Sequence, residues 1–138
     1  MAEKIKMASQ FIQALPHAQA LGMHLEKLEP GEAKISMPYA EHLVGDPKTG
    51  VVHGGAVSAL MDTACGAAVM SHPSNPAHTA TIDLRIEYLR SAVPGQTITT
   101  TATCYHVTRS VAFVRAIASD EDTTRPVAMA TGTFTVGS

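Results

Sequence analysis

The spacing of apolar and polar residues changes several times along this chain, and each spacing predicts a different element. Residues 3–15 repeat apolar positions at helical intervals, which predicts a short amphipathic helix that ends at Pro16. Its apolar stripe consists of Ile5, Phe11, Ile12 and Leu15. Residues 21–28 and 33–37 predict the two strands of a hairpin, because turn-forming residues separate them. Residues 38–50, with several glycines and prolines, predict a loop.

The longest apolar segment follows this loop and predicts a helix from about Gly54 to Met70. Small and apolar residues dominate the segment, which predicts that the helix is buried. A group of histidine, proline, serine and asparagine residues at 72–76 ends it. No apolar stretch of the chain reaches the roughly 20 residues that a membrane-spanning helix needs. The sequence therefore does not predict a membrane protein.

Four strands are predicted after the long helix, at residues 79–89, 97–106, 110–119 and 127–136. The first alternates, with Ile82, Leu84, Ile86 and Tyr88 on one face and Asp83, Arg85 and Glu87 on the other. The third is strongly apolar and is predicted to be a central strand. An antiparallel sheet with one long buried helix is the simplest packing for this order of elements. We therefore predict an α+β fold with a single domain over residues 1–138.

Composition and charge narrow the possible partners. The chain has 45% hydrophobic and 16% charged residues, which is usual for a globular domain. Its formal net charge of -2 gives no reason to expect nucleic acid or an anionic membrane as a partner. The N-terminus lacks the apolar core of a secretion signal, and Cys65 and Cys104 fall inside predicted elements as buried free thiols. These features favour a cytoplasmic location.

Asp62 is the only Asp, Glu, Lys or Arg residue between Lys48 and Asp83, and it lies in the middle of the predicted buried helix. A carboxylate that is buried without a basic neighbour in the sequence needs a reason for its desolvation. One reason is catalysis, because desolvated acids serve as general bases or nucleophiles. The pattern alone also allows an ordinary aspartate on a solvent-exposed helix face.

Two glycines, Gly54 and Gly55, open the predicted helix. Glycine lets a ligand approach the backbone closely, and the first N–H groups of a helix are unpaired donors with positive potential. Such donors can polarise a carbonyl and hold a developing oxyanion. Asp62 lies about 12 Å further along the helix, at about 1.5 Å per residue, which is too far for both groups to serve one carbonyl. A second copy of the helix in the opposite sense would bring one chain's Gly54 near the other chain's Asp62, so a catalytic site of this kind predicts a homodimer.

The motif resembles a known family. His53-Gly54-Gly55 followed by Asp62, with Gly50 before it and Thr63-Ala64 after it, is similar to the hotdog-fold acyl-CoA thioesterases of the phenylacetate-pathway type, PaaI-like members of the 4-hydroxybenzoyl-CoA thioesterase superfamily. Residues 81–90, Arg109-Ser110 and residues 130–134 also look like that family. The resemblance covers nearly the whole chain from about Leu21, and it favours the catalytic interpretation of Asp62.

The resemblance implies the fold, the assembly and the reaction. The fold would be the hotdog, an antiparallel sheet wrapped around the long helix, in a homodimer that often pairs again into a homotetramer. Asp62 would activate water as a general base or attack the thioester directly. The Gly54 backbone N–H would bind the thioester oxygen, and His53 would shape or contact the same region. A thioester needs no cofactor, since CoA is part of the substrate and its thiolate leaves readily.

Further residues are candidates for substrate binding through the same resemblance. Gly55 continues the helix start, and Thr81 matches a Ser/Thr position near the site of some relatives. Relatives commonly carry an asparagine in the loop before the His-Gly-Gly motif, where Asp46 is the nearest match here; an aspartate cannot donate as an amide does. Arg90 and Arg109 fall at strand ends, where relatives often hold the CoA phosphates. For Thr81, Asp46 and both arginines, ordinary structural roles remain open.

Other functions fit the sequence less well. The remaining histidines show no metal-ligand spacing, so no metal is expected. Cys65 lacks a histidine-based activation pattern and is expected to be a small core residue. A non-catalytic acyl-CoA-binding hotdog module remains the alternative, although the chain has no spare length for an output domain. A hotdog hydratase or dehydratase would need a different His/Asp layout. The acyl group cannot be read from the sequence.

Overall fold

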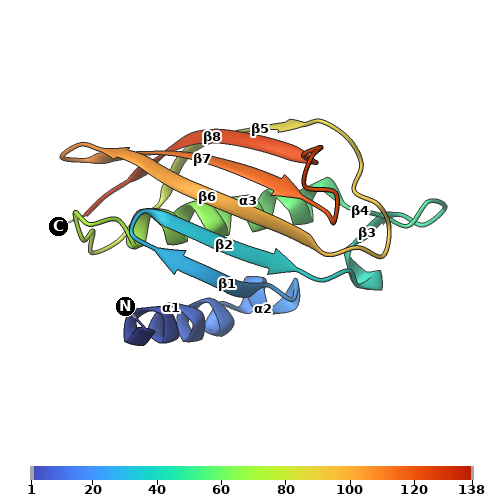
Figure 1. Ribbon diagram of the computed structural model, residues 1–138, viewed down its shortest axis with the longest axis horizontal. Coiled ribbons are helices and arrows are strands. Elements are labelled where there is room, and N and C mark those ends of the chain that lie inside the picture. Colours follow the sequence, from blue (N-terminus) through green and yellow to red (C-terminus); the bar gives the residue numbers. More distant parts are fainter. Residues whose placement is uncertain (1, 138) are drawn as a thin grey trace.

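The computed structural model describes residues 2–137 and consists of an antiparallel sheet of six strands wrapped around a long helix (Figure 1). The strands are β1 (His24–Glu29), β2 (Glu32–Met37), β5 (Thr81–Tyr88), β6 (Ile98–Val107), β7 (Val111–Ser119) and β8 (Ala128–Thr135). Their order in the sheet is β1-β2-β6-β7-β8-β5, and all neighbours are antiparallel. The helix is α3 (Gly54–Met70), which lies behind the sheet in Figure 1. The predicted α+β architecture and the bounds of the long helix are confirmed.

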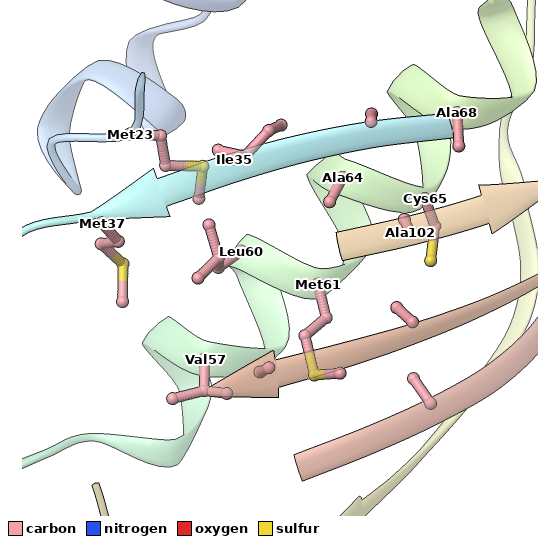
Figure 2. Close-up of a cluster of buried hydrophobic side chains, with 14 of the residues drawn as sticks. Met23, Ile35, Met37, Val57, Leu60, Met61, Ala64, Cys65, Ala68 and Ala102 are labelled. Atoms are coloured by element: carbon pink, nitrogen blue, oxygen red, sulfur yellow. The ribbon is translucent and has the colours of Figure 1, made fainter. Parts of the chain in front are cut away.

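One face of α3 forms the centre of the core. Its buried residues repeat at helical spacing: Ala56, Val57, Leu60, Met61, Ala64, Cys65, Ala68 and Val69. They pack mainly on β6, β2 and β7. Figure 2 shows Leu60 near Ile35 and Met37, and Met61 pointing toward other strands of the sheet. Each large side chain that is fully buried in this way contributes about 1.5–3 kcal/mol to folding. Burial against the sheet therefore fixes which face of α3 is left for other contacts.

The opposite face of α3 carries small residues and Asp62. The residues on this face are partly buried or exposed, and they are Gly55, Ser58, Ala59, Asp62, Thr63, Gly66, Ala67 and Met70. Asp62 is half-buried, so it is neither a core residue nor a freely solvated one. Both predicted free thiols lie on the core side, since Cys65 and Cys104 are buried and unbridged. This separates Cys65 from the face that presents Asp62.

The predicted hairpin and the predicted central strand are also confirmed. The β1–β2 turn contains Gly31 with a φ of +73°, a backbone conformation that L side chains rarely adopt. β7 lies between β6 and β8, and its residues alternate between buried and less buried positions, with Ala112, Val114, Ala116 and Ala118 inward. One face of β7 is therefore buried in the core and the other is less buried, as expected when successive side chains point to opposite faces of a sheet.

The N-terminal segment and the loop before α3 contain more structure than the sequence predicts. α1 (Ala2–Ala14) confirms the first helix; its Ile12 is buried, while the side chains of Ile5 and Phe11 lie outside the described residues. Pro16 ends α1 but also begins a second short helix, α2 (Pro16–Ala20), because proline suits the first position of a helix. The predicted loop 38–50 holds a 3-10 turn, η1 (Glu41–Leu43), and a small ladder of β3 (Val44–Asp46) and β4 (Val51–Val52).

The two edges of the main sheet differ. Beside β1 lie α1 and α2, whereas β5 has β8 as its only strand neighbour in the described sheet (Figure 1). At and just beyond β5, Ile82, Tyr88 and Leu89 are 55%, 51% and 53% exposed. The predicted apolar face of this strand is therefore only partly covered. Its Leu84 and Ile86 side chains pack against the core, whereas Ile82 and Tyr88 remain exposed. An exposed apolar edge strand is a surface for pairing with another chain.

Candidate active site

His53 caps the N-terminus of α3. Its backbone is extended, with φ of -60° and ψ of 134°, and its Nδ1 accepts the backbone N–H of Gly55 at 2.8 Å. Since Nδ1 uses its lone pair in this bond, the proton of the neutral ring is on Nε2. A Cβ added to Gly55 would lie 2.9 Å from Nδ1 of His53, closer than real contacts allow. Glycine at the second position of the motif therefore leaves room for the folded-back imidazole.

The loop before α3 packs tightly against His53. The His53 N–H donates to the Leu43 carbonyl at 2.7 Å, and a Cβ added to Gly45 would lie 2.9 Å from the His53 Cα. Asp46 is exposed, and its carboxylate accepts the backbone N–H of Lys48 at 3.0 Å. This is the local turn closure that aspartates often provide. The structure thus gives Asp46 a loop role, and its predicted contact with substrate stays a prediction.

Gly54 is the first residue of α3, so its N–H has no carbonyl one turn earlier in the helix. Its carbonyl accepts the Tyr88 hydroxyl at 3.0 Å and the Ser58 hydroxyl at 3.1 Å, and these two hydroxyls also contact each other. A Cβ on Gly54 would make only ordinary contact with the Tyr88 ring, at 3.6 Å. Tyr88, the last residue of β5, therefore holds the carbonyl of Gly54, and among the described residues no acceptor takes the Gly54 N–H, which belongs to an exposed residue.

Asp62 has one specific partner among the described residues. The Thr81 hydroxyl donates to Oδ1 of Asp62 at 2.5 Å, while none of the described ion pairs involves this carboxylate. The hydrogen bond holds one oxygen and leaves Oδ2 to act on a ligand.

Burial raises the pKa of the Cys65 thiol to about 12, and the nearby charges of Asp62 and Cys104 act in the same direction. Cys65 is therefore a buried core thiol, as predicted.

The two halves of the predicted site lie apart in one chain. Gly54 is held by Tyr88 at the end of β5, and Asp62 is held by Thr81 at its beginning. α3 and β5 therefore run side by side in opposite directions. Along the helix the two groups are separated by about 12 Å, at about 1.5 Å per residue. One described chain does not bring them to the same carbonyl.

Arg90 is occupied by the protein itself. It makes a bidentate ion pair with Asp120, with both distances at 2.7 Å, and also donates to the carbonyls of Ser91 and Arg125. The Arg90 side chain is 18% exposed and the Asp120 side chain is fully buried. All the N–H directions of the guanidinium are thereby used, which leaves none for a phosphate. The predicted phosphate contact of Arg90 does not fit this geometry.

Arg109 is exposed in the turn between β6 and β7. The neighbouring Ser110 carbonyl accepts the Val136 N–H at 3.1 Å, which places this turn beside the C-terminal end of the described chain. Figure 1 shows this end of the sheet away from the beginning of α3. Arg109 therefore stays a predicted binding residue that one chain does not bring to Gly54.

Sequence reasoning missed Tyr88 and Ser58 as parts of the helix start. Ser58 and Tyr88 are 30 residues apart, and Gly54 and Tyr88 are 34 residues apart. The only signal in the sequence is the apolar alternation of β5, which puts Tyr88 on the face of Ile86. That signal predicts a face and not a partner.

Other kinds of site are not found in the described chain. Among the His, Cys, Asp and Glu side chains that the structure describes, no three gather closely enough to hold a metal ion. Of the helices within residues 2–137, none has the length and hydropathy to cross a membrane. The groups that remain at the site are a half-buried carboxylate with a hydroxyl donor and an exposed helix N-terminus, which suit hydrolysis of an activated acyl group.

Fold and site together define a hotdog protein of the thioester-hydrolase class. The family model described as "Thioesterase superfamily" matches residues 49–127, and the chain belongs to this family. The medium/long-chain acyl-CoA thioesterase YigI of Escherichia coli is 29% identical over an alignment of 140 positions, which covers 92% of this chain and 89% of that protein. A Halobacterium salinarum protein is 45% identical over 75 residues, and this match spans about half of each, 52% of this chain and 50% of that protein.

A solved structure has the fold that the sequence predicts. The E. coli PaaI protein of the phenylacetic acid degradation operon superposes with a TM-score of 0.86, over 99% of this chain and 95% of that chain. At 21% identity this likeness concerns the fold. This likeness confirms the PaaI-like hotdog fold expected from the His-Gly-Gly motif. The match to the thioesterase family model confirms the class of enzyme.

Proposed function

We propose that this protein is an acyl-CoA thioesterase whose active site forms between two copies of the chain. Asp62 of one copy acts as general base or nucleophile, and the Gly54 backbone N–H of the other copy polarises the thioester carbonyl. The name of the YigI relative supports a CoA ester as the substrate. No cofactor takes part, since water and the thioester are sufficient for the reaction.

The observation that carries this proposal is the antiparallel course of α3 and β5. Thr81 and Asp62 are at one end of β5, and Tyr88 and Gly54 are at the other. If two β5 edges pair antiparallel about a two-fold axis, the first residue of each strand lies opposite the last residue of its partner. Gly54 then lies next to the partner's Asp62, and two equivalent sites form. The exposed apolar residues Ile82 and Leu89 become covered in the same contact.

The chemistry follows from these groups. In the general-base route, Oδ2 of Asp62 takes a proton from water while the water oxygen attacks the thioester carbon. The carbonyl oxygen gains negative charge next to the Gly54 N–H and the positive end of α3. The intermediate then collapses, the C–S bond breaks, and the CoA thiolate receives the proton. In the nucleophilic route, the carboxylate attacks the thioester carbon, the C–S bond breaks and CoA leaves as its thiolate. Water then hydrolyses the resulting anhydride to the free acid and the Asp62 carboxylate, and the released proton goes to the thiolate.

The remaining expectations from the sequence belong to this proposal. The homodimer is the smallest complete unit, and a homotetramer would join two such dimers. His53, with its proton on Nε2, lies at the helix start beside Gly54 and would contact the same ligand. A cytoplasmic location would suit an enzyme that acts on CoA esters.

The test separates the two contributions by putting them in different chains. Gly54→Pro removes the N–H and keeps the helix start, because proline is tolerated at the first helical position and the extended backbone of His53 suits a following proline. Gly54→Ala is the matched control that keeps the N–H. Asp62→Asn removes the charge, with Glu121→Gln as an exposed carboxylate control. Release of CoA thiol from a panel of acyl-CoAs is measured for each variant.

We expect Gly54→Pro and Asp62→Asn to lose at least a hundredfold in kcat while both controls retain activity. Co-expressed, the two inactive variants should recover about a quarter of wild-type activity, because half of the dimers are mixed and each has one intact site of two. Absence of recovery, with dimers present, would exclude a shared site. Absence of turnover by the wild type, with CoA esters still bound, would favour the non-catalytic binding module.

A further inference from the structure

A cavity of about 520 Å³ lies between α1 and the outward face of α3. Met7, Ala8, Ile12 and Leu15 of α1 form one wall. Thr63, Gly66, Ala67 and Met70 of α3 form the opposite wall. Asp62 and Thr81 also line it, so the cavity is continuous with the carboxylate of the proposed site.

The lining has no free hydroxyl proton to offer. Thr63 donates to the Ala59 carbonyl at 2.7 Å and Thr79 donates to the Thr135 carbonyl at 2.6 Å. Ser71 donates to the carbonyls of Glu29 and Ala68, and Thr81 donates to Asp62. Among the described residues that line the cavity there is no lysine, arginine or histidine. A group with polar substituents would lose hydration here without gaining a donor, so the cavity suits a hydrocarbon.

The lining of the cavity suits an aliphatic chain better than an aromatic ring. Phe134 is the only aromatic residue among the described lining, and the other large side chains are flexible methionines and branched aliphatics. Gly66 faces the space, and a Cβ there would make only ordinary contact with the Phe134 ring at 3.8 Å. The fold therefore does not need glycine at this position, and the open space is available to a ligand. From Asp62 to Met70 the wall extends about 12 Å, at about 1.5 Å per residue.

We infer that this cavity binds a straight aliphatic acyl chain and that α1, with Met7 and Ile12, is the wall that limits its length. The inference rests on the proposed thioesterase function and adds the substrate class. The thioester would lie at Asp62, and the chain would run along Gly66 and Ala67 toward Met70. Ile12 is buried and anchors α1, while Met7 is 65% exposed at the rim. Each methylene that enters the cavity improves kcat/KM about fourfold, until the chain meets the wall.

The test compares chain-length profiles. Butanoyl-, octanoyl-, dodecanoyl- and hexadecanoyl-CoA are hydrolysed by the wild type, together with phenylacetyl-CoA as an aryl substrate. Gly66→Leu fills the floor of the cavity and Met7→Trp fills its rim. Gln10→Trp is the control, because Gln10 is an exposed residue of α1 that does not line the cavity. The readout is the ratio of kcat/KM for dodecanoyl-CoA to kcat/KM for butanoyl-CoA.

We expect the wild type to prefer octanoyl-CoA over phenylacetyl-CoA. Gly66→Leu and Met7→Trp should lower the dodecanoyl-to-butanoyl ratio at least tenfold, and Gln10→Trp should leave it within about twofold. An unchanged ratio in Gly66→Leu and Met7→Trp, with active enzyme, overturns the inference and leaves the thioesterase proposal intact. A preference for the aryl substrate overturns the aliphatic assignment.

If the wild type hydrolyses none of these esters, the thioesterase proposal fails first. The cavity is then tested by calorimetric binding of dodecanoyl-CoA and butanoyl-CoA. Tighter binding of the longer ester, lost in Gly66→Leu, supports the cavity as an acyl site. Equal binding of both esters overturns it.

Discussion

Thr81 donates its hydroxyl to Oδ1 of Asp62 over 2.5 Å, and this bond joins the middle of α3 to the first residue of β5. The bond holds one carboxylate oxygen of Asp62 and leaves the other oxygen free to act on a ligand. A carboxylate with one oxygen fixed has a defined orientation, and Asp62 and Thr81 both line the cavity between α1 and α3. We interpret Thr81 as a positioning residue for Asp62 rather than as an ordinary strand threonine.

Replacing Thr81 tests this interpretation. Thr81→Val keeps the shape and removes the donor, and hydrogen bonds to charged groups contribute about 1.5–3 kcal/mol, so kcat should fall about 10- to 100-fold. Thr81→Ser should restore most of the activity because it restores the hydroxyl. Thermal unfolding of each variant checks that the fold is intact. Equal losses in Ser and Val variants would contradict a positioning role.

The cap of α3 by His53 gives a prediction on stability. Gly55→Ala places a Cβ 2.9 Å from Nδ1 of His53 and should push the imidazole out of its cap, at about 1 kcal/mol of unfolding free energy. His53→Ala should cost about the same for the same reason. The double variant should cost little more than either single one, because both remove one hydrogen bond. Urea unfolding measures all three, and additive losses would show that the two residues act independently.

The Arg90–Asp120 pair predicts how stability depends on pH. The hydrogen bonds from Arg90 hold the pKa of Asp120 well below its usual range, with help from the N–H groups of Val93 and Asp122 and against the effect of burial. Since the folded pKa is below the unfolded value of about 3.9, the pair stabilises the fold fully above that pH. This contribution is lost as the pH falls below about 4 toward the folded pKa.

Asp120→Asn should therefore lower the melting temperature by several degrees at pH 7, because it leaves the Arg90 charge without its partner. The difference between Asp120→Asn and wild type should shrink as the pH is lowered through the acid range. Asp83→Asn, an exposed aspartate without an ion pair among the described residues, is the control. A difference that is the same at pH 7 and at pH 3 would contradict the assigned role of Asp120.

The exposed edge of β5 predicts how assembly and activity are linked. Ile82 is already 55% exposed, so Ile82→Lys should leave one chain folded but place two charges in the proposed dimer contact. Sedimentation should show monomers, and activity should fall together with the dimer. Ile117→Lys changes an apolar residue that is 46% exposed on β7 and should leave the dimer active. Active monomers of Ile82→Lys would exclude a shared site.

The buried thiols give a chemical test of the core. Because burial raises the pKa of both thiols, and that of Cys65 to about 12, very little thiolate exists at neutral pH. A thiol reagent should leave both cysteines unmodified in the native protein and modify both after unfolding. Cys65→Ala should retain activity, since the thiol lies on the core face of α3 and away from Asp62. Rapid native labelling of Cys65, or loss of turnover in a folded Cys65→Ala variant, would contradict this.

The sequence by itself determined the order of elements, the bounds of α3 and the family. These follow from local signals: the alternation of strands, the glycines after His53, the prolines after Met70 and the His-Gly-Gly motif with Asp62. It left α2 and the short β3–β4 ladder undetected, because elements of five, three and two residues carry too few periodic positions to be recognised.

Only the tertiary structure decided which partners the candidate residues have. Thr81 and Asp62 are 19 residues apart, and Arg90 and Asp120 are 30 residues apart. A candidate residue can bind a ligand or stabilise the fold, and the packing of distant segments decides between these roles. In this fold, groups of the chain itself accept all the N–H groups of the Arg90 guanidinium, whereas one oxygen of Asp62 stays free. The cavity between α1 and α3 has the same origin, since its volume depends on how segments far apart in the sequence fit together and not on the pattern of either one.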